Sequence, residues 1–466
     1  MSTELTLSAR QGPRSPVVVV GLATLALVTA AGIVLAAVEM QWAALGVLGL
    51  AVLGVVAILG VRHFAMLMLC VVALRPMVGS EGVEAGLGGL DPGDLLGLVF
   101  IAAASTWLLA HWRSLRPRTT SPVALTSAAL VLLAALSAAT SCCRMATIGG
   151  TLKLGSFVLI LLVLERLAAE DPRYAEKAVG VALVASVPSV LLAITQHFSG
   201  ADTSDLFDVS RVTGLFSHPN LLATHLTLLL LLVISVFPYL VRRLQVAAGM
   251  YVVAAGSALF FTLSRTAWLA FVAGLLLVGL LQHRAVLIGV ILLLPVLTLA
   301  VPGIQSRFSD VSLESLQVGE VVDPEEEFTQ SNTLEWRIAY WGKVLPLAQG
   351  NELRGVGFET VAERRPEAFP PHNEFVRAFV EMGIFGLLAF GAVLVACART
   401  AILGLRSAQP GLQRGFAIAF CACAVALAIR LPVENLLTDV PNLWLFAVIA
   451  APVLGRLSSA ADDPAS

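Results

Sequence analysis

The sequence predicts an all-α protein that crosses a membrane about 12–14 times. Two features of composition and one pattern predict this class. Hydrophobic residues make up 58% of the 466 residues, charged residues make up only 13%, and long apolar runs recur along the chain. A soluble enzyme of this length would lack the polar surface that keeps a protein in solution. The net charge of -2 gives no basic footprint for nucleic acid.

Each predicted span is an apolar run that approaches the length needed to cross the hydrocarbon core. In chain order the spans are 16–38, 42–60, 64–79, 94–112, 122–140, 148–166, 178–198, 218–240, 245–263, 266–282, 285–302, 374–398, 414–430 and 440–457. The run at 64–79 is short. No clear cleavage site closes 16–38 and further spans follow it, so we interpret it as a span and not a signal peptide.

The basic residues predict the orientation, because cytoplasmic loops collect Lys and Arg. With the N-terminus inside, alternate loops place these basic residues in the cytoplasm: Arg10, Arg14, Arg62, Arg113, Arg116, Arg118, Arg166, Arg173, Lys177, Arg242, Arg243, Arg284, Arg399, Arg406, Arg414 and Arg456. The outward loop 80–93 is acidic instead. Both termini are therefore predicted to be cytoplasmic.

One predicted outward loop, 303–371, is far longer than an ordinary connection between helices. Within it, apolar and aromatic residues at helical spacing predict an amphipathic helix over 333–348, lying on or near the membrane. The stretch 314–330 is acidic and is predicted to be a mobile excursion. A second outward loop runs from about 199 to 217.

Several cationic side chains are predicted to gather at the outer face. They are Arg75, Lys153, Arg211, Arg265, Arg337 and, when protonated, His372. Ionisable groups at membrane depth are costly and indicate function by default. Because a guanidinium binds phosphate oxygens in bidentate fashion and stays protonated, such a group of cations suits a diphosphate.

Each of these residues also has a structural interpretation. Arg75 and Lys153 can extend toward the headgroups. The pair Ser264-Arg265 can simply end one helix and begin the next. Arg337 can pair with a nearby carboxylate such as that of Glu335. His372 follows two prolines at a helix start and can be a capping residue.

Four stretches from Arg211 onward resemble the O-antigen ligase and O-antigen polymerase family of bacterial membrane glycosyltransferases. They are RVTGLFSHPNLLATHLTLLLLL (211–232), TLSRTAWLAFVAGLLL (262–277), EWRIAYWGKVLPLAQGNELRGVGFETV (335–361) and PHNEFVRAFVEMGIFGLLAFGAVL (371–394). The last two are the most specific. They join an Arg-x-x-x-Trp helix, Gly-x-Gly-Phe, His-Asn-x-x-Val and Glu-x-Gly-Ile-x-Gly.

The resemblance divides the chain into four parts. They are N-terminal transmembrane helices at 1–190, a ligase/polymerase-like core at 191–400 with the extracytoplasmic loop 303–371, C-terminal helices at 401–457 and a cytoplasmic tail at 458–466. The resemblance implies a GT-C-like architecture in the bacterial cytoplasmic membrane with its active site on the extracytoplasmic side. It also implies a glycan donor linked to a polyprenyl diphosphate, and no cofactor or bound metal.

The resemblance implies roles for particular residues. Arg211 and Arg265, with Arg337 third, would hold the diphosphate. His372 would take the proton of the acceptor hydroxyl; alternatively, it only orients the substrate and the proton passes to solvent or phosphate. Asn373 would orient the histidine or a sugar hydroxyl.

Further residues are predicted to bind substrate with less direct support. His218 and Asn220 flank Pro219, a pattern equally typical of a helix start. Gly355 and Gly357 follow no predicted strand, so a tight turn beside a lipid or sugar fits them better than a nucleotide loop. Lys153 and Arg75 complete the predicted substrate-binding set.

The acceptor is expected to be a glycan, a glycolipid or a glycoprotein. A ligase moves a finished glycan, whereas a polymerase moves the growing chain onto the next repeat unit; the sequence leaves both open. A rival function is a transporter or flippase for a lipid-linked anion, which would need charges or broken helices near the midplane. A second rival is a non-catalytic membrane scaffold.

Overall fold

The computed structural model describes residues 63–78, 92–111, 120–200, 204–206, 209–282, 334–364 and 369–461, with a few isolated positions between 284 and 291. The predicted spans 16–38 and 42–60, most of 285–302, and the acidic stretch 314–330 lie outside the described residues.

Apart from one small hairpin, the regular secondary structure of the described residues is helical. The helices are η1 (Arg75–Met77), α3 (Pro92–His111), α4 (Pro122–Ser137), α5 (Arg144–Glu170), α6 (Pro172–Ser199), α7 (Pro219–Val236), η2 (Phe237–Tyr239), α8 (Arg242–Phe261), α9 (Arg265–Leu281), α13 (Leu334–Val344), η4 (Leu345–Ala348), α14 (Val361–Arg364), α15 (Glu374–Ser407), α16 (Leu412–Arg430) and α17 (Val440–Ala461). The hairpin pairs β1 (Ser204–Leu206) with β2 (Val209–Arg211) in antiparallel fashion.

Eight of the described helices are long and apolar enough to cross a membrane, and three shorter apolar helices accompany them. The shorter ones, His63–Met77, α4 and α9, coincide with the predicted spans 64–79, 122–140 and 266–282. The all-α membrane fold is therefore confirmed. The predicted amphipathic segment 333–348 is helical too, as α13 followed by η4.

Proline and a polar cap begin several of the long helices. Ser121 and Asp171 precede Pro122 and Pro172, and each polar side chain accepts a hydrogen bond from a backbone N–H of the first turn. Proline at the first position costs no hydrogen bond, since that N–H has no partner within a helix. The observed start of α4 coincides with the predicted start at 122, whereas α6 begins at Pro172, six residues before the predicted start at 178.

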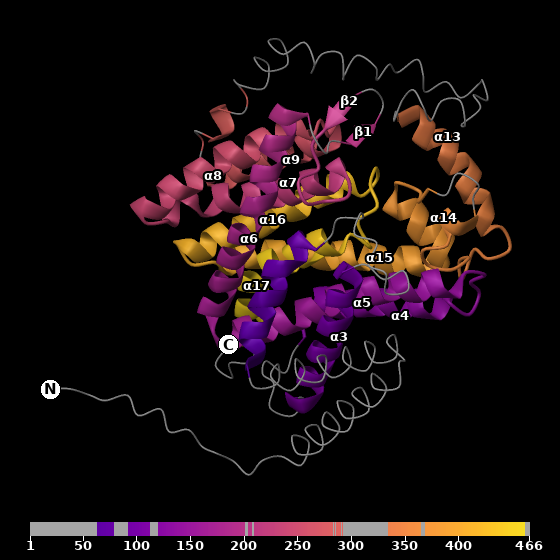
Figure 1. Ribbon diagram of the computed structural model, residues 1–466. Coiled ribbons are helices and arrows are strands. Elements are labelled where there is room, and N and C mark those ends of the chain that lie inside the picture. Colours follow the sequence, from indigo (N-terminus) through magenta and orange to yellow (C-terminus); the bar gives the residue numbers. More distant parts are fainter. Residues whose placement is uncertain are drawn as a thin grey trace, which may run out of the picture.

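The centre of the bundle is formed by α5, α7, α16 and α17 (Figure 1). The side chains on their inner faces are buried. Small residues allow close approach of helices: a Cβ on Gly455 of α17 would meet the backbone and Cβ of Ala168 of α5. The helices alternate in direction, so the ends of α6, α8 and α16 and the starts of α7, α9, α15 and α17 share one end of the bundle. The candidate site lies at this end.

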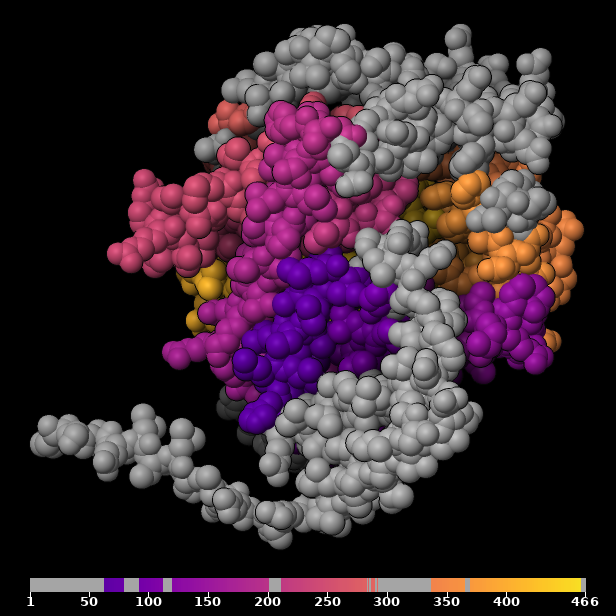
Figure 2. All heavy atoms as spheres, viewed as in Figure 1, coloured from indigo at the N-terminus to yellow at the C-terminus, as the bar shows by residue number. Residues whose placement is uncertain are grey.

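Helix α15 is broken by Gly383, whose φ of 70° is not helical. The backbone N–H of Ile384 donates to the carbonyl of Glu352, at 2.8 Å, instead of to its own helix. The turn at 351–361 therefore packs directly on the first half of α15. In Figure 2 this orange region also borders the purple segment around 140–150, where Thr140 Oγ1 donates to the carbonyl of Gly355.

Candidate functional site

A buried carboxylate, Glu434, lies at the centre of a group of cationic and polar side chains. It follows α16 by one turn, and its side chain is 8% exposed. Its Oε1 accepts a hydrogen bond from Asn220 Nδ2 at 2.9 Å and pairs with Arg430 Nη2 at 3.4 Å. Both contacts use the same oxygen, so Oε1 is held while Oε2 has no hydrogen-bond partner among the described residues.

Arg211 joins this group from the end of β2. Its Nη2 donates to Asn220 Oδ1 at 2.9 Å, and its Nε donates to the carbonyl of Thr262 at 2.8 Å. Asn220 thus bridges Arg211 and Glu434 with the two ends of one amide. Because Thr262 lies three residues before Arg265, the same contact places the start of α9 beside the group.

Two further guanidinium groups are buried here, with donors that the described residues leave unpaired. Arg430 is 1% exposed, and its Nε and Nη1 have no partner in the described part of the chain. Arg337 of α13 is 8% exposed, and its Nε is similarly unpaired. Its electrostatic neighbours are Glu434, which stabilises its charge, and Arg430, which opposes it. Buried donors without partners are costly and suit an absent acceptor ligand.

His218 caps helix α7 at this site. Its Nδ1 accepts a hydrogen bond from the backbone N–H of Asn220 at 3.1 Å. Burial lowers the pKa of His218 to about 4; Glu434 opposes this shift, while Arg211 and Arg430 add to it. A neutral imidazole whose Nδ1 accepts a hydrogen bond carries its proton on Nε2.

His372 is held by Asn435 through two hydrogen bonds. The backbone N–H of His372 donates to Asn435 Oδ1 at 2.9 Å, and Asn435 Nδ2 lies 3.1 Å from His372 Nδ1. The residue adopts a φ of 50°, which is uncommon outside glycine. Burial lowers the pKa of His372 to about 4, helped by the charge of Arg337 and opposed by Glu434.

Helix α13 is fastened to the segment that precedes His372. Tyr340 donates its hydroxyl to the carbonyl of Phe369 at 2.5 Å, and Trp341 Nε1 donates to the carbonyl of Pro371 at 2.8 Å. These aromatic residues are on the same helix as Arg337. Arg337 and His372 therefore reach the site as parts of one connected unit.

The structure brings together five residues that the sequence singled out: Arg211, His218, Asn220, Arg337 and His372. Arg265 stands at the adjacent turn. Sequence reasoning missed Arg430 and Asn435, and it assigned no role to Glu434. The sequence did hold a signal for the Arg430–Glu434 ion pair, because the two residues are four positions apart at the end of an apolar run.

Asn373, Gly355 and Gly357, three other residues predicted to bind substrate, make contacts that support the fold. Asn373 caps α15, its Oδ1 accepting from the backbone N–H groups of Phe375 and Val376. Gly355 has a φ of 73° and packs against the backbone of α15. Gly357 has a φ of 115° and packs against Ser141. Their predicted substrate contacts stay predictions.

The remaining two lie elsewhere. Arg75 is buried beside α17, where it donates from Nη1 to the carbonyl of Gly93 at 3.0 Å and lies 5.7 Å from the Trp444 ring centroid. Its charge also acts on Asp439, whose pKa burial raises to about 6. Lys153 is exposed on α5. For both, substrate binding stays a prediction.

A second ionic cluster surrounds Arg377 on the first turns of α15. The guanidinium is completely buried and pairs with three carboxylates, those of Glu359 (2.5 Å), Glu374 (3.4 Å) and Glu381 (3.1 Å). It also lies 4.8 Å from the ring centroid of Phe358. The carboxylates in turn accept backbone N–H groups from the turn at 359–361 and the loop at 436–437. This cluster ties three chain segments together.

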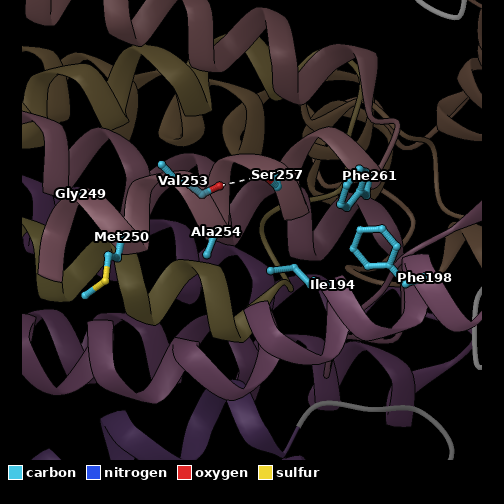
Figure 3. A pocket seen from close by; sticks show the side chains of 8 residues that line it. All are labelled: Ile194, Phe198, Gly249, Met250, Val253, Ala254, Ser257 and Phe261. Carbon is cyan, nitrogen blue, oxygen red and sulfur yellow. Dashed lines mark hydrogen bonds between the residues drawn. The ribbon is translucent and has the colours of Figure 1, made fainter.

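An apolar groove of about 560 Å³ runs between α6 and α8 (Figure 3). Met250 lies toward one end, and Phe198 and Phe261 lie together at the other. Phe261 directly precedes Thr262, whose carbonyl Arg211 contacts. The aromatic end of the groove therefore adjoins the Glu434 group.

Residues 250–391 match the family described as O-Antigen ligase. This match confirms the family resemblance and supports a glycosyltransferase of the O-antigen ligase or polymerase type in general. It covers α9, α13 and the start of α15, and hence Arg265, Arg337 and His372. No curated protein matches the chain in sequence.

Proposed function

We propose, from the O-Antigen ligase match at residues 250–391, that this membrane protein transfers a glycan from a polyprenyl-diphosphate carrier to an acceptor sugar hydroxyl. The transfer takes place at the outer face of the cytoplasmic membrane, during assembly of a surface polysaccharide. The carrier diphosphate is the leaving group. The family match supports the reaction class, and the Glu434 group supports the donor.

The observation that carries the proposal is a set of unpaired guanidinium donors beside Glu434. Arg337 and Arg430 are buried, and Arg337 Nε and Arg430 Nε and Nη1 have no hydrogen-bond partner among the described residues. A diphosphate supplies negative charge and acceptors for these donors. In well-studied sites, one preorganised donor at developing charge contributes about 3–4 kcal/mol to the lowering of the barrier.

The groove between α6 and α8 gives the carrier a place for its tail. It is lined by apolar side chains and by one hydroxyl, that of Ser257, which already donates to the carbonyl of Val253 at 3.0 Å. Its aromatic end adjoins the turn that Arg211 contacts. A polyprenyl chain lying in the groove would bring its diphosphate to the guanidinium groups.

Transfer then proceeds by direct displacement. The acceptor oxygen attacks the anomeric carbon, the bond from that carbon to the diphosphate oxygen breaks, and the configuration inverts. The guanidinium groups stabilise the charge that develops on the leaving diphosphate. His372 and Glu434 border the place where the acceptor hydroxyl must lose its proton.

The test uses purified full-length protein in lipid nanodiscs, with polyprenyl-diphosphate saccharides extracted from cells in which the protein is inactive. Mass spectrometry follows release of the free polyprenyl diphosphate. We expect Arg337→Gln to slow release about 100-fold or more, by analogy with the loss of one oxyanion donor. Lys343→Gln, on the same helix, is the matched control and should keep the wild-type rate.

The products separate the alternatives. Saccharides one repeat longer indicate a polymerase, and a long glycan on a different carrier indicates a ligase. If the wild-type protein leaves the donor intact while moving it across the bilayer, the protein is a transporter and the proposal is wrong.

A further inference from the structure

We infer that Glu434 takes the proton from the acceptor hydroxyl and that His372 donates a hydrogen bond to the substrate through Nε2. Asn435 is the positioning residue that fixes this role of His372. The inference rests on the proposed function and deepens it. It reverses the expectation, from the family resemblance, that His372 is the base.

The backbone N–H of His372 fixes the orientation of the Asn435 side-chain amide. A backbone N–H is always a donor, so the atom of Asn435 that faces the N–H of His372 must be the amide oxygen. The other end of the amide is then the NH₂ group, and it faces His372 Nδ1 at 3.1 Å. An amide NH₂ only donates, so Nδ1 must accept.

The Asn435 amide in turn fixes the tautomer of the His372 imidazole. A neutral ring that accepts at Nδ1 carries its hydrogen at Nε2. An imidazolium would point an N–H at the amide NH₂ of Asn435, which disfavours the charged form. In this state Nε2 has a proton to share and no lone pair to receive one. A base at Nε2 would require the opposite tautomer.

Glu434 is a group that can accept the proton of the acceptor hydroxyl. Glu434 immediately precedes Asn435, so the carboxylate and the imidazole are presented by one short loop. Both contacts of the carboxylate, from Asn220 and from Arg430, converge on Oε1. They fix the carboxylate and leave Oε2 unpartnered among the described residues, as a positioned base requires.

In the proposed transfer, the acceptor O–H bond breaks and its proton goes to Glu434 Oε2. The oxygen forms a bond to the anomeric carbon, and the electron pair of the breaking C–O bond leaves with the diphosphate. The protonated Glu434 then gives its proton to water or to the departing diphosphate.

The experiment compares variants that preserve shape and change one property, in the release assay described above. Glu434→Gln keeps an oxygen for Asn220 and Arg430 but has no basic site, so its kcat should fall about 10²- to 10⁴-fold. The KM for the donor should stay or fall, because a negative charge leaves the cationic group. A purely structural role would instead change folding and KM together.

His372 is tested by two substitutions. His372→Gln retains an NH₂ donor but has no basic nitrogen, so it should keep more than a tenth of the wild-type kcat, whereas His372→Ala should keep much less. If His372 were the base, both variants would be equally inactive, and that result would overturn the inference.

Asn435→Asp supplies an independent test of the tautomer. Its second carboxylate oxygen requires a proton on His372 Nδ1, which moves the lone pair to Nε2. In the ¹⁵N spectrum of histidine-labelled protein at alkaline pH, the wild-type His372 signal should report Nε2–H and the Asn435→Asp signal Nδ1–H. The variant should lose turnover at that pH; a faster variant would assign the base to His372.

The outcomes distinguish this inference from the proposed function. If the wild-type protein releases polyprenyl diphosphate and Glu434→Gln releases it at a similar rate, only the inference fails. If the wild-type protein releases none, the proposed function itself fails.

Discussion

The Glu434 and Arg377 clusters are built from the same residue types but satisfy their cations to different degrees. Around Arg377, one buried guanidinium is shared by three carboxylates. Beside Glu434, the buried guanidinium groups of Arg337 and Arg430 keep donors that have no hydrogen-bond partner among the described residues, although Glu434 and Asp439 both stabilise the charge of Arg430. The first arrangement saturates its cation and ties chain segments together. The second arrangement keeps donors that an anion can use.

The difference shows how to separate structural from functional charge in a membrane protein. Both clusters are buried and lie at the same end of the bundle, so burial alone does not distinguish them. The unpaired donors beside Glu434 distinguish the two clusters. A cluster that satisfies its cation should govern stability, whereas one with surplus donors should govern binding and turnover.

The largest expected effect is on stability, from Arg377→Met. Three carboxylates would lose their shared guanidinium, and breaking such a buried group costs about 3–5 kcal/mol. Thermal unfolding in detergent, followed by tryptophan fluorescence, measures the loss. Arg337→Gln is the comparison: it removes one cation from a surplus, so its unfolding temperature should stay near that of the wild type. Equal destabilisation by both substitutions would contradict the distinction.

A smaller effect is expected from Gly355→Ala, which perturbs the turn that presents Glu359 to Arg377. The φ of 73° is unfavourable for alanine by about 1–2 kcal/mol, and the new Cβ would meet the backbone of Glu381. Unfolding should therefore occur at a lower temperature. Gly342→Ala on α13 is the matched control, because no described residue lies within 4 Å of its added Cβ; it should be neutral or stabilising.

The smallest effect is expected at Asn373. Loss of the cap in Asn373→Ala should destabilise the protein by about 1 kcal/mol, whereas Asn373→Asp retains a capping oxygen and should match the wild type in both stability and turnover. Measured turnover decides whether Asn373 only caps α15 or also contacts substrate. An Asp variant that folds normally but is inactive would show that the amide itself contacts substrate.

The fold was largely predictable because hydropathy and helix-start signals are local. Pro122, Pro172 and Pro219 mark helix starts in the sequence, and each is the first residue of its helix. The predicted spans fell on the described helices for the same reason. Backbone hydrogen bonds must be satisfied within each span, which leaves little freedom in architecture.

The candidate site was only partly predictable, because its residues come together through tertiary contacts. Arg211 and Arg337 stood out as cations in predicted outward loops. Asn435 did not, since its role depends on a contact with His372, 63 residues away. The saturated surroundings of Arg377 were invisible for the same reason: Glu359 reaches it from a separate turn.

The link between α13 and the histidine segment has a consequence for substrate binding. Tyr340 and Trp341 fasten the helix that carries Arg337 to the residues just before His372. A displacement of Arg337 would therefore be transmitted to the segment that presents His372. By thermodynamic reciprocity, any factor by which the donor changes the affinity for the acceptor is the factor by which the acceptor changes the affinity for the donor.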